Sequence, residues 1–272
     1  DHQRLMEAYQ VTARRFEGVS ATLTRVDDHS LAFDLSRDAS EIRVTNDGAD
    51  IPLHACVDPV NLQLGQPLAR ARIVDRGARG TAVGFSMSHA VADGYGFFLF
   101  LMAWAAQARG SDFPAPNCDR TLLSNPQARN PAQASADVGP LEQSGFVLVD
   151  GTEPLLSLQM EDWYVAPAEL RAQIPGAIDA YSTHELLSAV LWKKCLQHAP
   201  YPTATLTCPV DIRRFRDALG PLYFGNAFLQ AAVRVETEQL RAASVAEIAG
   251  WIHSAVAAVP QRIDAAIAEL EA

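Results

Sequence analysis

The feature that most constrains the fold is residues 81–110, where a strand pattern leads into two ionisable residues, two glycines and a long apolar segment. Large and small side chains alternate from 82 to 88, which indicates a β-strand with one bulky face. The segment 97–106 is apolar on every side, which is typical of a buried helix. Gly110 follows a basic last turn and predicts where that helix ends.

His89 and Asp93 lie at the junction between this strand and this helix. Strand-to-helix junctions are where α/β proteins commonly place ligands and reacting groups. An ionisable pair between two apolar elements costs free energy unless each group is paired or used in chemistry. The two residues are therefore the first candidates for a functional site.

The composition excludes several classes of protein. The formal net charge of the 272 residues is -10, whereas a nucleic-acid-binding face needs clustered basic residues. The longest apolar stretch, 97–106, is too short to span a bilayer, which takes ~20 residues. The four cysteines form no C-x-x-C pair, so we expect free, mostly buried thiols in a cytoplasmic protein. The sequence has no metal-ligand spacing and no glycine-rich phosphate loop, so no metal site is predicted.

The first half of the chain is predicted to contain a helix and several short strands. A weak apolar face indicates a helix at 4–17. Alternating runs predict strands at 19–25, 30–35, 41–45, 69–74 and 81–88. We expect the first three to be antiparallel, and the last to return antiparallel to the strand before it.

The residues from 111 to 145 differ from their surroundings, because prolines and asparagines replace large apolar side chains. Such a composition is typical of a long loop or linker. We therefore predict an N-terminal half at 1–130, a linker at 131–145 and a C-terminal half at 146–272.

Two capping boxes of the S-x-x-E type indicate the main helices of the second half. Ser182 with Glu185 predicts a helix that runs to about residue 198, and Ser244 with Glu247 predicts one that runs to about residue 271. The remaining predicted elements are strands at 146–149, 155–160, 204–210 and 228–235, and a helix at 167–173.

Residues 89–94, His-Ala-Val-Ala-Asp-Gly, resemble the H-x-x-x-D-G signature of the BAHD family of acyl-CoA-dependent acyltransferases. These enzymes share a superfamily with chloramphenicol acetyltransferase and the condensation domains of peptide synthetases. Three further segments match family patterns in the same order: 182–192 resembles S-T-x-E-x-L-x-x-x-x-W, 211–213 resembles D-x-R, and 223–226 resembles Y-F-G-N. A single H-x-x-x-D arises often by chance, but this ordered set over nearly the whole chain is specific.

The resemblance implies an α/β fold of the chloramphenicol-acetyltransferase type. In this α+β, two-layer arrangement a mixed β-sheet is covered by helices, and two similar halves, here with the second incomplete, place His89 at a channel between them. Family chains are longer and carry a D-F-G-W-G loop near the C-terminus, and no such string occurs here. We therefore expect a fragment of a longer acyltransferase, partnered by the rest of its own chain. Ser88 stands where condensation domains usually carry a second histidine, which favours the BAHD branch.

His89 is the predicted general base. A neutral imidazole, with an ordinary pKa of about 6.5, can take the acceptor's proton at physiological pH. The alternative for His89 alone is a buried histidine satisfied by a backbone carbonyl. Asp93 could orient the imidazole as a triad aspartate does. The resemblance instead implies that Asp93 points away and pairs with an arginine, for which Arg213 is the first candidate and Arg214 and Arg216 are rivals.

The other predicted site residues follow from the same resemblance. Gly94 supports the site by leaving room for the donor or the turn. Asn226, Gly225, Tyr223 and Ser86 are predicted to line the site. The alternative for Asn226 and Gly225 is that they merely close a turn before a strand. A backbone N–H near Gly94, or Asn226, could stabilise an oxyanion.

The predicted function is acyl transfer from an acyl-CoA thioester to a hydroxyl or amine of a small acceptor of the secondary-metabolite type. Acyl-CoA is then a co-substrate, with no bound cofactor and no covalent acyl-enzyme. Two alternatives stay open. One is a condensation-type enzyme that uses a carrier-protein thioester, and the other is a degenerate member of the fold that only binds a ligand or partner.

Overall fold

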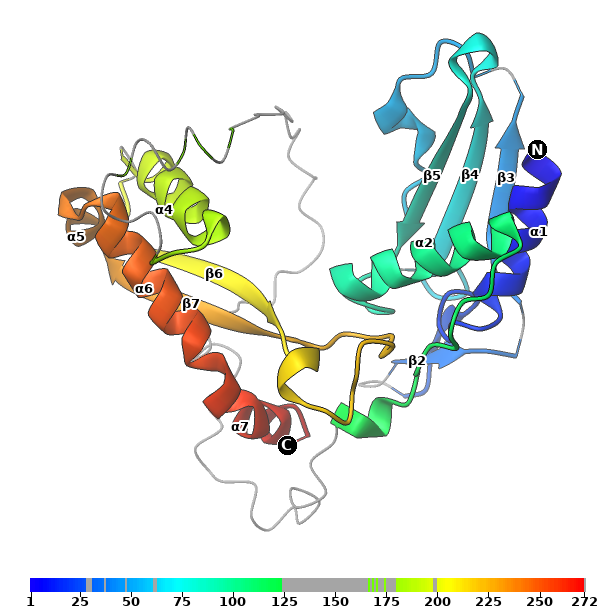
Figure 1. Ribbon diagram of the computed structural model, residues 1–272. Coiled ribbons are helices and arrows are strands. Elements are labelled where there is room, and N and C mark those ends of the chain that lie inside the picture. The colour runs from blue at the N-terminus through cyan, green and yellow to red at the C-terminus, as the bar shows by residue number, and fades with distance from the viewer. Residues whose placement is uncertain are drawn as a thin grey trace. The chain divides into compact units, whose positions relative to one another are not determined.

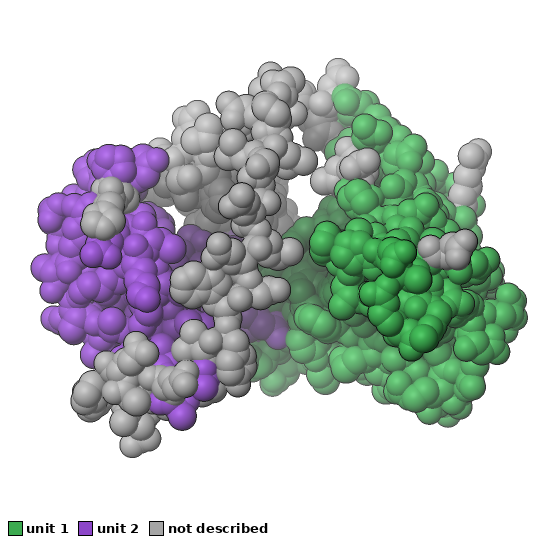
Figure 2. Space-filling view, turned by 90° about the horizontal axis from the view of Figure 1, so that it is seen from above, with its two compact units in different colours: residues 1–123, 213–228 green, residues 124–212, 229–272 purple. Residues whose placement is uncertain are grey.

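The computed structural model describes residues 1–27, 31–36, 38–46, 48–60, 63–123, 166, 168, 170, 174, 180–197 and 200–271. The chain divides into two compact units, distinguished by colour in Figure 2. Unit 1 contains residues 1–123 and 213–228, and unit 2 contains 124–212 and 229–272. The linker at 131–145, the strands at 146–149 and 155–160 and most of the helix at 167–173 lie outside the described residues.

The main sheet of unit 1 has the strand order β3-β4-β5, formed by Glu41–Thr45, Ala69–Asp75 and Thr81–Met87. β4 and β5 are antiparallel, as predicted, with Ala71 opposite Phe85. β3 pairs parallel with β4, so the prediction of an antiparallel β3 was wrong. The chain between them, which includes the 3₁₀ helix η1 (Leu53–Cys56), is long enough for the crossover that a parallel pair needs. β1 (Thr22–Arg25) and β2 (Leu31–Asp34) form a separate antiparallel pair.

Two helices pack on one face of this sheet, α1 (His2–Ala13) and α2 (Gly94–Arg109). Figure 1 shows α2 crossing in front of the strands. Their shared core is aromatic: the ring of Tyr9 lies 5.1 Å from that of Trp104 and 5.9 Å from that of Phe100. The indole N–H of Trp104 donates to the carbonyl of Leu5 in α1 at 2.9 Å. This core fixes the helix that begins at the predicted site.

The ends of α2 follow the predicted signals, but its burial does not. Gly110 adopts the left-handed conformation (φ 71°), and its N–H bonds to carbonyls of the last turn, so the predicted end is confirmed. Phe98 and Met102, however, are 63% and 51% exposed. The prediction of a helix buried on every side was therefore wrong. An apolar sequence reports which faces can be buried, whereas the neighbouring elements decide which faces are.

Unit 2 combines a two-stranded sheet with helices. The sheet contains β6 (Thr203–Asp211) and β7 (Phe228–Glu236), whose first residue belongs to unit 1. Both predicted capping boxes are present and begin α4 (Thr183–Cys195) and α6 (Val245–Ala257). The predicted C-terminal helix is two helices, because α6 ends at Ala257 and α7 covers Val259–Glu271. The short α5 (Thr237–Ala242) was not predicted. Among the described residues, the 3₁₀ helices η2 (Gly77–Arg79), η3 (Arg120–Leu123) and η5 (Arg213–Phe215) belong to unit 1.

The described residues include no helix that is both long and apolar enough to cross a membrane. Within the same residues, no cluster of three histidine, cysteine or acidic side chains could hold a metal ion. All four cysteines are free thiols. Cys56 and Cys208 are buried, whereas Cys118 is half-buried and Cys195 exposed, so only two of the four match the predicted burial.

Candidate active site

The centre of the site is a buried ion pair between Asp93 and Arg213. Arg213 Nη1 donates to Asp93 Oδ2 at 2.9 Å, and Nη2 donates to Oδ1 at 3.0 Å. The two residues are 6% and 5% exposed. Both belong to unit 1, although 120 residues separate them in the sequence. This two-point geometry fixes the orientation of both planar groups as well as the distance between them.

Asp93 has two further donors, both from the backbone. Its Oδ1 accepts from the N–H of Gly96, which makes Asp93 the N-cap of α2, and its Oδ2 accepts from the N–H of Ala227, each at 2.9 Å. Both carboxylate oxygens are thus engaged, and neither bonds to the imidazole of His89. The arrangement is a structural anchor, and a triad-like contact with the histidine is not present.

Arg213 is also fully surrounded by partners on its other side. Its Nε donates to the carbonyl of Tyr223 at 3.1 Å, and Nη2 donates to the carbonyl of Gly225 at 2.8 Å. The ring of Tyr95 lies 4.6 Å from the guanidinium carbon, a cation–π contact. The rival Arg214 instead packs over the ring of Phe215. A charge this deeply buried needs several partners to offset its desolvation.

His89 lies in the turn between β5 and α2 and is exposed. Its ring centre is 5.7 Å from that of Phe228. Asn226 Nδ2 donates to the backbone carbonyl of His89 at 2.8 Å, so this asparagine holds the backbone of the predicted base. Within the described part of the chain, no hydrogen bond occupies either ring nitrogen. The alternative of a buried, carbonyl-satisfied histidine is therefore not the observed arrangement.

The remaining predicted site residues fall into two groups. Tyr223 is fully buried and Gly225 is buried, and their carbonyls accept hydrogen bonds from Arg213. Ser86 donates its hydroxyl hydrogen to the carbonyl of Asp58. These three residues brace the backbone, and their contact with substrate stays a prediction. Gly94 is different, because a Cβ built on it would meet nothing within 4 Å.

Sequence reasoning missed three partners of this centre. The N–H groups of Gly96 and Ala227 bond to Asp93, and Arg120 Nη2 donates to the carbonyl of Val91 at 3.0 Å. An aspartate directly before a helix start is a known N-cap signal and could have identified the first contact. Nothing in the proline- and asparagine-rich context of Arg120 indicates its position, because that contact depends on the fold.

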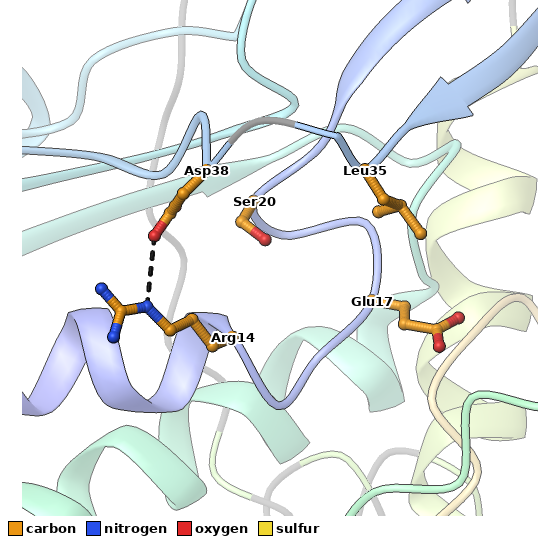
Figure 3. A pocket seen from close by; sticks show the side chains of 5 residues that line it. All are labelled: Arg14, Glu17, Ser20, Leu35 and Asp38. Carbon is orange, nitrogen blue, oxygen red and sulfur yellow. Dashed lines mark hydrogen bonds and ion pairs between the residues drawn. The ribbon is translucent and has the colours of Figure 1, made fainter.

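Unit 1 also holds a small polar pocket that none of the predicted site residues lines. Its volume is about 320 Å³, and Figure 3 shows the five side chains around it, which are Arg14, Glu17, Ser20, Leu35 and Asp38. Arg14 Nε pairs with Asp38 at 3.3 Å across one side. A hydrogen bond from Ser40 lowers the pKa of Asp38 below its ordinary value, although partial burial opposes this. Arg14 and Asp38 thus balance each other, and Glu17 adds a negative charge to the lining.

Comparison with known proteins decides the family. A family model described as the Transferase family matches residues 64–270, which include every predicted site residue. The chain belongs to this family, the BAHD acyltransferases. Piperine synthase of Piper nigrum is 30% identical over 65% of this chain and 40% of its own length. Benzyl alcohol O-benzoyltransferase of Nicotiana tabacum is 29% identical over 61% of this chain and 37% of its own length. The BAHD chain described here thus spans about two fifths of the length of these curated relatives.

Solved structures confirm the predicted chloramphenicol-acetyltransferase-like fold for this BAHD chain. The crystal structure of F. graminearum TRI101 complexed with ethyl coenzyme A matches 99% of this chain, and the match covers 70% of the TRI101 chain, with a TM-score of 0.67. Its sequence identity is 14%, so this match concerns the fold alone. The predicted division at 131–145 and the channel between the halves stay predictions.

Proposed function

We propose that this chain carries the catalytic base of an acyl-CoA-dependent acyltransferase, with His89 as that base. The observation that supports the proposal is an exposed imidazole on a loop that Asn226 and the buried Asp93–Arg213 pair hold in place. Asn226 bonds to the carbonyl of His89, and the Asp93–Arg213 pair anchors the end of the same loop. Family membership supports the same reaction class.

In the proposed reaction, His89 accepts the proton of an acceptor hydroxyl or amine while that oxygen or nitrogen attacks the thioester carbonyl. The resulting tetrahedral intermediate collapses, the carbon–sulfur bond breaks, and the thiolate of CoA leaves. The imidazolium then gives its proton to the thiolate, which returns His89 to its neutral form. No acyl group is ever bonded to the protein. The contribution of the fold is to hold the base in position, which can account for a large part of such a rate.

The proposed substrates follow from the names of the relatives. These include a benzyl alcohol O-benzoyltransferase from Nicotiana tabacum and a spermidine coumaroyl-CoA acyltransferase from Arabidopsis thaliana. We propose acyl-CoA as co-substrate and a small alcohol or amine of secondary metabolism as acceptor, with the rest of a longer chain as a partner. A cytoplasmic location is part of the proposal, because the four cysteines are free thiols.

Gly94 has a proposed role that differs from that of the other supporting residues. It follows Asp93 directly, and the space beside its Cα is open. A side chain there would project into that space, so we propose that the glycine leaves room for the donor next to the base. Tyr223, Gly225 and Ser86 are proposed to act through the backbone contacts described above.

The direct test replaces His89 with alanine in the whole natural protein and follows the release of free CoA thiol from a panel of acyl-CoA donors and alcohol or amine acceptors. The expected result is a loss of on the order of 10²–10⁴-fold in kcat, with unchanged folding by circular dichroism. Arg214→Ala is the matched control, because Arg214 is exposed and its guanidinium packs over the ring of its neighbour Phe215. Undiminished turnover in His89→Ala would refute the proposal.

A further inference from the structure

We infer that Arg120 is a positioning residue for the base, and that residue 225 is a glycine because the guanidinium of Arg120 fills the space where a side chain would lie. The inference rests on the proposed function, since the loop that Arg120 holds, residues 89–93, carries His89. Two different arginines then secure this loop, Arg213 through the carboxylate of Asp93 and Arg120 through the carbonyl of Val91.

Backbone pairing brings Arg120 to this position. The N–H of Asn117 donates to the carbonyl of Leu222, and the carbonyl of Asn117 accepts from the N–H of Phe224, both at 2.8 Å. These bonds form a parallel bridge between Asn117 and Tyr223. The side-chain oxygen of Asn117 also accepts from the N–H of Asp119 at 3.0 Å. Arg120, the first residue of η3, therefore starts from a fixed backbone, so its contact with the loop costs the rotamer entropy of its side chain but little backbone entropy.

The contact of Arg120 with the loop is a charge-assisted hydrogen bond at its middle residue. Arg120 Nη2 lies 3.0 Å from the carbonyl oxygen of Val91, a residue with no exposed surface. Bonds from charged donors are stronger than neutral ones. Three alternate residues of the loop are thus held by three different side chains, His89 by Asn226, Val91 by Arg120 and Asp93 by Arg213. Removing the middle contact leaves, of these three side-chain contacts, the two at the ends of the loop.

Gly225 lies between the two guanidinium groups. A Cβ built on it would lie 1.7 Å from Arg120 Nη1 and 2.9 Å from its Cζ, well inside van der Waals contact, and 3.0 Å from Cε1 of Tyr223. On the other side, the Gly225 carbonyl accepts from Arg213 Nη2 at 2.8 Å and from the N–H of Asp93 at 3.4 Å. The φ angle of Gly225 is not in the left-handed region, so backbone conformation does not require a glycine. The two atoms nearest to that Cβ belong to Arg120, and the ring of Tyr223 is the next contact, so space rather than backbone conformation requires the glycine.

This arrangement makes a distinctive prediction. Gly225→Ala should act mainly by displacing Arg120, which supplies the two closest contacts, so most of its effect should disappear once Arg120 is already absent. If the two residues were independent, their effects would multiply instead. Arg120→Lys provides a second background, because its ammonium can still donate to the Val91 carbonyl but is narrower than a guanidinium. Gly225→Ala should therefore be better tolerated in that background than with Arg120.

The kinetic test measures kcat and KM for both substrates in Arg120→Ala, Gly225→Ala, the double variant of these two, Arg120→Lys, and Arg120→Lys combined with Gly225→Ala. We expect a fall of about 10- to 100-fold in kcat for each of the first two, because small displacements of a catalytic group have effects of this size. The KM for acyl-CoA should stay within twofold, and the double variant should be no slower than the slower single variant. Losses that multiply in the double variant, or a kcat within twofold in Arg120→Ala, would overturn the inference.

A structural readout separates this inference from the proposed function. The N–H groups of Val91 and Asp93 bond to the carbonyls of Ser88 and Gly225, so their hydrogen exchange reports on the loop. Exchange at both should accelerate in Arg120→Ala and Gly225→Ala, and it should be unchanged in Arg214→Ala. This holds even if wild-type protein shows no acyl transfer, in which case only the proposed function fails. Unchanged exchange in folded Arg120→Ala overturns the positioning role.

Discussion

Replacement of Asp93 gives the sharpest stability prediction. In Asp93→Ala the guanidinium of Arg213 stays buried, at 5% exposure, without its counter-charge. Breaking one partner of a buried ion pair typically costs ~3–5 kcal/mol of unfolding free energy. The loss also removes the N-cap of α2, whereas Asp93→Asn keeps a side chain that can still cap the helix. The alanine variant should therefore be less stable than the asparagine variant by a further ~1 kcal/mol.

Urea unfolding, followed by the intrinsic fluorescence of the four tryptophans, which include Trp104 in unit 1, measures this effect. For an m-value of ~3 kcal/mol/M, a loss of ~3–5 kcal/mol lowers the midpoint by about 1–1.7 M. Asp50→Ala is the matched control, because Asp50 and Arg79 form an ion pair on the surface, and such pairs contribute little. A loss below ~1 kcal/mol in Asp93→Ala would contradict the reasoning from burial. A variant with native stability but no activity would instead indicate a direct chemical role for Asp93.

Two further predictions concern single elements. Gly110→Ala should destabilise the protein by ~1–2 kcal/mol in the same urea assay, because an alanine is strained at φ 71°; an unchanged midpoint would argue against this cap. Burial favours a higher pKa for Glu185, but hydrogen bonds from Ser182 and His253 outweigh it and hold the pKa below the ordinary 4.5. Since a lowered folded-state pKa adds stability that is lost on acidification, stability should fall as the pH drops below 4.5. Glu185→Gln should flatten that dependence, and an equally steep curve in the variant would refute the assignment.

Local signals in the sequence predicted the parts of the fold that depend on neighbouring residues. The capping boxes at Ser182 and Ser244 work within one helical turn, and both begin helices where expected. Gly110 likewise ends α2 through bonds to the preceding turn. In contrast, the alternation at 41–45 identified β3 but could not give its direction, because both parallel and antiparallel strands alternate in the same way.

The site shows the same division between local and long-range information. Arg213 was chosen over Arg214 and Arg216 only through the resemblance of 211–213 to a family pattern, since spacing alone does not rank three arginines in four residues. Tyr223 and Gly225 were predicted to line the site. In the structure their backbone carbonyls accept hydrogen bonds from Arg213, and no side-chain pattern in the sequence encodes such a contact. No sequence pattern identified Arg120 as part of the site, because its contact with Val91 joins segments 29 residues apart in the chain.

The order in which the chain is synthesised has a consequence for the buried pair. Arg213 follows Asp93 by 120 residues, and residues 124–212 of unit 2 are made between them. At about 5–20 residues per second, Asp93 leaves the peptidyl-transfer centre about 6–24 s before its partner is made. Once residue 109 has been made, the sequence of the main sheet and of both helices of unit 1 is complete, but the carboxylate of Asp93 still lacks its counter-charge. Nascent chains stalled before residue 213 should accordingly be protease-sensitive and bound by chaperones, and release from both should coincide with the emergence of the 213–228 segment.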